Sequence, residues 1–300
     1  MKRLLTIQDI SCVGQCSTTV ALPVISACGV ECSVLPPAIL SNHTGGFTGW
    51  SFCDLTGELK KVEAEWVRQG IRFDAFYTGY VCESHIDPIL SIMESCANPG
   101  AVRIVDPAMA DNGVLYKGFT ADFPSRMARL VKGADYVLPN LTEAALLVGE
   151  DPSIGWSGQE AASPVGGANP SCDATAGAAA SSPRHTVERL ISKLHALGAK
   201  NVVLTGVSFN DTELGSAISD GAKIVYDFNP RLKRMSHGTG DVFASVFAGA
   251  VMRGRSAAEA ASLAADIVCA AIEATDDDHW YGVSFERAIP ELVAQIANGR

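Results

Sequence analysis

The sequence lacks three features that would each assign it to a class of protein. It has no uninterrupted apolar run close to the roughly 20 residues that a membrane-spanning helix needs. It has no surplus of positive charge, because it contains 23 Lys and Arg residues but 33 Asp and Glu residues. A nucleic-acid-binding surface, in contrast, is basic. Its first residues turn polar at Gln8 and Asp9, too early for a secretion signal. We therefore expect a soluble cytoplasmic protein that binds neither membranes nor nucleic acid.

Two common nucleotide-binding motifs are also missing. The chain contains no Gly-x-x-x-x-Gly-Lys-Ser/Thr, which argues against a P-loop kinase. It contains no complete Gly-x-Gly-x-x-Gly after the first predicted strand, where a dinucleotide-binding fold needs it. No repeat of solenoid length is visible either.

Nine cysteines are present, an odd number, and we expect them to be free thiols because disulfides are rare in the cytosol. Cys12 and Cys16, and Cys28 and Cys32, form two pairs with three residues between partners. A zinc site is the alternative, but this spacing is loose for zinc, and Cys28 and Cys32 fall in a predicted helix and a predicted strand. Small buried thiols are the favoured interpretation, and Cys172 is expected to have no role.

Segments of strand length alternate with helical patterns along most of the chain. The predicted strands are 3–8, 31–35, 74–78, 102–106, 135–138 and 201–205, followed by an antiparallel pair at 213–219 and 223–228 around Asp220-Gly221. The predicted helices are 17–28, 58–70, 84–97, 120–132, 142–148, 184–197, 241–253, 256–274 and 284–297. This alternation predicts an α/β fold with a mostly parallel central sheet and helices on both faces.

The stretch 151–183 breaks the alternation, since it is rich in Ala, Gly, Ser and Pro. Because the pattern resumes beyond it, we expect a flexible surface insertion within a single domain spanning residues 1–300, rather than a domain boundary.

The stretch His237-Gly238-Thr239-Gly240-Asp241 precedes an apolar run that predicts a helix. Glycine lets backbone approach a ligand closely, and the free N–H groups at a helix start attract an anion, most often a phosphate. An aspartate in that first turn fits a base that takes a proton from an alcohol while the N–H groups stabilise a phosphoryl group in transit. The alternative is an ordinary Gly-rich turn with a helix-start aspartate, and the motif alone does not decide between the two.

Polar residues follow the ends of several predicted strands. They are Gln8 and Asp9, Gly79 and Tyr80, Asp106 and Asp111, Asn140 and Glu143, and Thr205 and Gly206. Ligands bind beyond the carboxyl ends of parallel strands, so these residues should share one edge of the sheet with Asp241. Several carboxylates around a phosphate need a cation between them, and oxygen ligands suit Mg²⁺. Each residue also has a simpler interpretation, since Asn140 or Thr142 would equally cap the next helix.

Taken together, these segments resemble the ribokinase superfamily, and within it the pyridoxal kinases. The segment Ser41-Asn42-His43-Thr44-Gly45 resembles the Ser-Asn-His-Thr of vitamin B6 kinases, and Thr78-Gly79-Tyr80 resembles their Thr/Ser-Gly-Tyr. Three further segments resemble the family's Asp-Pro-Val-Met/Leu-Gly-Asp, its Pro-Asn-x-x-Glu and its catalytic loop: 106–111, 139–143 and 238–241. The match runs in order along nearly the whole chain apart from 151–183, and it implies a ribokinase-like fold.

The resemblance also implies an activity, in which Mg-ATP donates its γ-phosphoryl group to the 5′-hydroxymethyl group of a B6 vitamer (pyridoxal, pyridoxamine or pyridoxine). Asp241 would be the catalytic base, and Gly238, Thr239 and Gly240 would line the anion hole. Asp9, His43, Thr44 and Tyr80 would bind the substrate, Asn140, Glu143 and Thr205 would bind ATP, and Asp106, Asp111 and Glu143 would organise the metal. A homodimer is expected, as in much of the family. For His43 itself a structural role is the alternative.

Two positions depart from the family pattern. Leu138 stands where many members carry Thr or Ser at a monovalent-cation site, so a need for that cation stays open. Asp9 follows the first strand where many pyridoxal kinases carry Ser, and its carboxylate would accept a hydrogen bond from the ring phenol, pair with an amine, or serve only the loop. Two other functions remain open: a hydroxymethylpyrimidine kinase of the same superfamily, and a non-catalytic protein that binds a vitamer or nucleotide.

Overall fold

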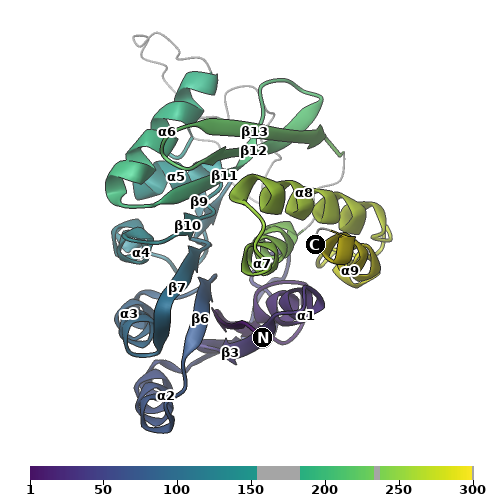
Figure 1. Ribbon diagram of the computed structural model, residues 1–300. Coiled ribbons are helices and arrows are strands. Elements are labelled where there is room, and N and C mark those ends of the chain that lie inside the picture. The colour runs from purple at the N-terminus through teal and green to yellow at the C-terminus, as the bar shows by residue number, and fades with distance from the viewer. Residues whose placement is uncertain (154–182, 233–236, 299–300) are drawn as a thin grey trace.

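An eight-stranded sheet with helices on both faces forms the centre of the molecule (Figure 1). The computed structural model describes residues 1–153, 183–232 and 237–298. The strand order is β13-β12-β11-β10-β7-β6-β1-β3, and only β12 runs against the others. The strands are β1 (Arg3–Ile7), β3 (Glu31–Leu35), β6 (Phe73–Thr78), β7 (Ala97–Val105), β10 (Tyr136–Val137), β11 (Asn201–Val207), β12 (Glu213–Ser219) and β13 (Ile224–Pro230). The predicted α/β fold is confirmed.

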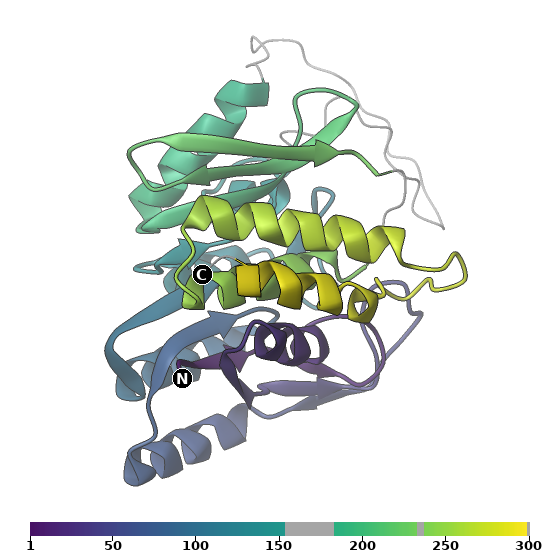
Figure 2. The same cartoon turned by 45° about the vertical axis from the view of Figure 1, so that its right-hand side comes forward.

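The helices form two layers, one on each face of the sheet (Figures 1 and 2). One layer contains α1 (Thr18–Ala27), α7 (Thr239–Met252), α8 (Ala257–Glu273) and α9 (Ile289–Asn298). The other contains α2 (Thr56–Gln69), α3 (Ile86–Ser95), α4 (Phe123–Val131), α5 (Leu141–Leu147) and α6 (Pro183–Leu197). Successive strand residues point to opposite faces, so Val203 joins the α7 core while Val202 and Leu204 join the α3–α6 core.

Helix α7 is the most deeply buried helix of its layer, which explains why its sequence is apolar all round. Every residue from Val242 to Met252 is buried, and the helix packs between α1 and α8 against the sheet (Figure 1). The core therefore fixes the position of its first turn, where Asp241 lies.

Several short elements were not predicted from the sequence. A small sheet joins β2 (Ile10–Ser11), β4 (Ala38–Leu40) and β5 (Phe52–Asp54), and a hairpin joins β8 (Ala110–Asp111) to β9 (Val114–Leu115). Two or three residues are too few to show a period, so tertiary pairing alone defines these strands. The predicted helix 284–297 is wrong at its start, where a 3₁₀ turn, η2 (Phe285–Arg287), precedes α9 and Pro290 occupies the first turn of that helix.

All eight cysteines in the part of the chain that the structure describes are free thiols. The prediction of small buried thiols holds for Cys16 and Cys28 but is wrong for Cys12, which is exposed just after β2. Cys172 and most of the predicted insertion at 151–183 lie outside the described residues. None of the described helices is long and apolar enough to cross a membrane.

A buried histidine ties the small sheet to the main one. His85, in the 3₁₀ turn η1 (Glu83–His85), is completely buried. Its Nδ1 accepts from the Cys82 backbone N–H at 2.9 Å, and its Nε2 lies 3.1 Å from Asp54 Oδ1 on β5. Since Nδ1 accepts, Nε2 carries the proton and the ring is neutral. Burial lowers the pKa of His85 against the opposing effect of Asp54.

This histidine should make folding sensitive to acid. The unfolded chain takes up a proton on His85 near pH 6.5, whereas the native chain does so only at lower pH, so the free energy of unfolding falls as the pH drops below about 6.5. The loss is at most about 1.4 kcal/mol per pH unit. Urea unfolding between about pH 7.5 and about pH 5.5 should show a smaller loss for His85→Gln than for the unaltered protein. The exposed His185 offers His185→Gln as a control, and an equal effect of both substitutions would contradict the assignment.

Candidate active site

The carboxyl ends of the parallel strands bring most of the predicted site residues to one edge of the sheet. Asp9 lies just beyond β1, Tyr80 just beyond β6 and Asp106 directly after β7. Asn140, just after β10, pairs with Thr205 of β11 through an isolated bridge. The start of α7 faces the same edge, which follows the rule for open parallel sheets.

The start of α7 is shaped by a glycine that no other residue can replace. Gly238 is the N-cap with φ 80° in the left-handed region. A Cβ atom there would lie 1.8 Å from the Gln15 carbonyl oxygen. A Cβ at Gly240, two residues further along the chain, would meet no atom within 4 Å. The backbone of the 238–241 turn is therefore pressed against the 12–17 loop on one side and open on the other, where its N–H groups can receive an anion.

Asp241 has the environment expected of a proton acceptor. It lies in the first turn of α7, and burial raises the pKa of its carboxyl group to about 7. The backbone N–H of Ser17 lowers the pKa of this carboxyl group, and the negative charge of Asp9 raises it. A base whose pKa lies near the working pH combines a large ionised fraction with good proton affinity.

Asp106 and Glu143 are two further buried acidic groups, and Asp106 interacts with both Glu143 and Asp241. They are 9% and 3% exposed. Burial raises the pKa of Asp106 well above its usual range, and the charges of Glu143 and Asp241 raise it further. Burial also raises the pKa of Glu143. Among the described residues, no Lys or Arg forms an ion pair with any of the three, so a cationic ligand would relieve their mutual repulsion.

Asn140 and Glu143 form a capping box that also holds the β8–β9 hairpin. Asn140 Oδ1 accepts from the Glu143 backbone N–H at 2.9 Å, and Glu143 Oε2 accepts from the Asn140 backbone N–H at 2.9 Å. Glu143 Oε1 accepts from Met109 N at 3.0 Å, and Asn140 Nδ2 donates to Ala110 O at 2.8 Å. The helix-cap interpretation of Asn140 is thus confirmed, whereas Thr142 instead accepts from Gly113 N. Both side chains shape the backbone of the site.

The 41–50 loop packs against His237, the residue before the 238–241 turn. The rings of His43 and His237 meet edge to face, with 5.6 Å between their centroids, and Phe47 packs on Trp280 at 4.8 Å. Thr44 is half-buried within this loop. Burial and the neighbouring His237 lower the pKa of His43 to about 4, so its ring is neutral at neutral pH.

The remaining predicted site residues differ in their burial and in their hydrogen bonds at the carboxyl edge of the sheet. Tyr80 is half-buried against Phe119, with 5.2 Å between ring centroids. Thr205 Oγ1 donates to Pro139 O at 3.3 Å, so its hydroxyl is already engaged. Asp111 is exposed on the β8–β9 hairpin and accepts from its neighbour's N–H.

Two residues that the sequence did not single out belong to the site. Tyr77 is fully buried on β6, and the charges of Asp106 and Asp241 add to burial in raising its pKa, so its phenol lies near both carboxylates. Ser17 has φ 52°, a conformation that non-glycine residues rarely adopt. Neither feature has a signal in the sequence, because one depends on strand register and the other on a backbone angle.

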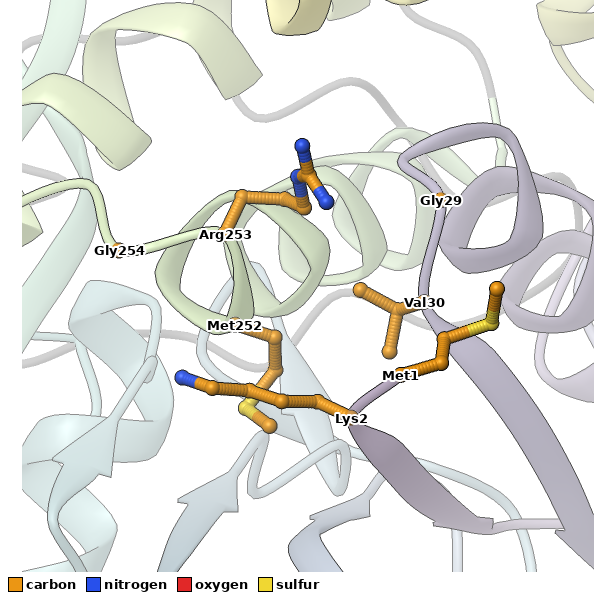
Figure 3. A pocket seen from close by; sticks show the side chains of 7 residues that line it. All are labelled: Met1, Lys2, Gly29, Val30, Met252, Arg253 and Gly254. Carbon is orange, nitrogen blue, oxygen red and sulfur yellow. The ribbon is translucent and has the colours of Figure 1, made fainter. Parts of the chain in front are cut away.

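A hollow at the opposite end of α7 is unconnected with this chemistry (Figure 3). Met1, Lys2, Gly29, Val30, Met252, Arg253 and Gly254 line it. It lies at the amino edge of the sheet, where α7 ends, about 20 Å from the helix start for a helix of this length.

The two glycines of the 238–241 turn offer a matched test. Gly238→Ala would bring a Cβ into contact with the Gln15 carbonyl and would place an alanine in the left-handed backbone region. The free energy of unfolding should therefore fall by about 1–2 kcal/mol or more. Gly240→Ala has open space and ordinary φ, so its effect should stay within about 0.5 kcal/mol. Urea unfolding of both variants checks this. Equal stability of the two variants would show that the contact with Gln15 is not close.

Known proteins with similar sequences and structures are kinases of small molecules. The model of the phosphomethylpyrimidine kinase family matches residues 172–282. A pyridoxal kinase PdxY from Rubrobacter xylanophilus is 27% identical, with 91% of this chain and 87% of the relative covered. The crystal structure of pyridoxal kinase from Lactobacillus plantarum superposes with a TM-score of 0.82 at 29% identity, covering 99% of both chains.

A second solved structure carries a different name. A protein from Bacteroides thetaiotaomicron, assigned as a phosphomethylpyrimidine kinase and solved in a form with pyridoxal, superposes with a TM-score of 0.82 at 29% identity, covering 97% of this chain and 95% of that one. The resemblance read from the motifs is confirmed. Along nearly its whole length the chain is similar to curated relatives and a solved structure that are named pyridoxal kinases.

Proposed function

We propose that this chain transfers the γ-phosphoryl group of ATP to the 5′-hydroxymethyl group of a B6 vitamer, giving the 5′-phosphate and ADP. One observation carries the proposal: a carboxylate with a pKa of about 7 stands in the first turn of α7, beside a glycine-lined backbone that is open to a ligand. The relatives named pyridoxal kinase support the choice of acceptor.

The chain's own groups account for the transfer by positioning and charge stabilisation. Asp241 accepts the proton of the alcohol as its oxygen attacks phosphorus. The N–H groups of the 238–241 turn, with the positive end of the α7 dipole behind them, stabilise charge on the phosphoryl oxygens. Pure binding of a nucleotide or vitamer would not require a base, which favours an enzyme over a binding protein.

The substrate side is built from Asp9, His43, Thr44 and Tyr80. The neutral ring of His43 and the phenol of Tyr80 provide apolar faces with polar edges for an aromatic ligand. Thr44 supplies a hydroxyl from the loop that closes on the catalytic turn.

The phosphate side fits Mg-ATP. Asp106, with Glu143 and Asp241 beside it, supplies buried negative charge that an oxygen-binding divalent cation would neutralise. Both oxygens of Glu143 already accept backbone N–H groups, so Asp106 would be the main protein ligand and the phosphates would supply others. When bound, Mg²⁺ would neutralise charge on the transferred group. Asn140 and Thr205 would border the phosphates, with Asp111 at the rim.

Several finer features belong to the same proposal. We propose that the protein acts in the cytoplasm as a homodimer of single-domain chains. A monovalent-cation site near Leu138 stays a prediction.

A substrate panel tests the reaction. Purified protein with Mg-ATP should release ADP when pyridoxal, pyridoxamine or pyridoxine is added, and less when hydroxymethylpyrimidine is added. Faster turnover of hydroxymethylpyrimidine would favour the phosphomethylpyrimidine kinase name carried by the matching family model. Vitamer binding without ADP release would indicate a binding protein.

Removing the base tests the mechanism. Asp241→Asn should lower kcat by about 10²- to 10⁴-fold, because the amide cannot accept the proton. Thermal unfolding should show an intact fold. Asp220→Asn, in the turn after β12 at the opposite edge of the sheet, removes one charge from the same chain and should leave kcat unchanged. Retention of near-full activity by Asp241→Asn would refute the role of Asp241.

A further inference from the structure

Asp9 is a buried carboxylate in the substrate half of the site. It is 2% exposed, and its Oδ2 accepts from the Ser11 hydroxyl at 2.8 Å. Within the described ranges no Lys, Arg or His forms an ion pair with it. Burying a carboxylate without a cationic partner costs free energy, and an aspartate with only a structural role in the loop could stay exposed to water. The burial of Asp9 therefore needs another explanation.

The groups around Asp9 offer no positive charge. Its charge acts on Asp241, Cys16, Tyr80 and Cys82, and raises the pKa of each. All four are acidic or neutral. Asp9, just beyond β1, and Asp241, at the start of α7, are thus two carboxylates close enough to interact electrostatically.

Ser17 links these two carboxylates. Its hydroxyl interacts with Asp9, and its backbone N–H interacts with Asp241. Ser17 makes both contacts while its backbone has a φ angle of 52°. Although Ser17 is the N-cap of α1, its side chain makes no helix-capping hydrogen bond. The chain therefore tolerates a strained residue where that residue holds both acidic groups in place.

We infer that Asp9 determines specificity by pairing with a positively charged N–H of the vitamer, while the vitamer's hydroxymethyl group faces Asp241. The inference rests on the proposed function. Two sources of this cation exist on the vitamers: the protonated ring nitrogen, common to all of them, and the amine of pyridoxamine. A charge-assisted hydrogen bond in a buried site supplies binding that a neutral ring cannot match.

The decisive variant is Asp9→Asn, which keeps size and removes charge. The dissociation constants of pyridoxine and pyridoxamine, measured by calorimetry, should rise about 10- to 100-fold. The KM for ATP should not change. Asp54→Asn is the matched control, because this carboxylate also acts on Cys82 but is half exposed to solvent; it should change vitamer binding less than about threefold.

The two vitamers separate the two sources of charge. If Asp9→Asn binds pyridoxine and pyridoxamine more weakly to the same degree, Asp9 contacts the ring nitrogen. If only the binding of pyridoxamine is weakened, Asp9 contacts the amine. Unchanged binding of both, or an effect no larger than that of Asp54→Asn, overturns the inference. If Asp9→Asn does not fold, Asp9→Ser serves the same comparison. Failure of the unaltered protein to phosphorylate any vitamer would refute the proposed function, whereas binding by Asp9→Asn tests only this inference.

Discussion

The close contact between Gly238 and the Gln15 carbonyl is the constraint on which the site depends. It fixes the start of α7 against the loop that follows β1. Because α7 is buried along its length, the helix cannot shift to relieve the contact. The loop in turn presents the Ser17 N–H to Asp241. A single backbone contact thereby sets the position of the base and the direction of the N–H groups beside it.

The site combines this fixed backbone with concentrated negative charge. Asp9, Asp106, Glu143 and Asp241 are acidic groups whose pKa values burial raises. Such a cluster weakens folding and makes sense only if ligands bring positive charge to it. A divalent cation with ATP would meet Asp106, and a cationic ring would meet Asp9. The two halves of the site thus use the same electrostatic principle for different ligands.

The sequence predicted the parts of the molecule that depend on period and on strand ends. Alternating apolar segments located the main sheet and its helices, and the rule for parallel sheets placed Asp9, Asp106 and Asp241 at one edge. The sequence could not predict the strands of two or three residues, nor the φ angle of Ser17, because both follow from tertiary contacts. It offered the helix cap for Asn140 only as an alternative, and it did not show that both carboxylate oxygens of Glu143 accept backbone N–H groups.

The most direct test of the central claim is a crystal structure with the ATP analogue AMP-PCP and pyridoxine bound together. The account predicts the hydroxymethyl oxygen of pyridoxine within about 3 Å of the Asp241 carboxylate. It also predicts the terminal phosphoryl oxygens against the N–H groups of the 238–241 turn. A vitamer bound with its hydroxymethyl group turned away from Asp241, or a nucleotide whose phosphates avoid this turn, would contradict it.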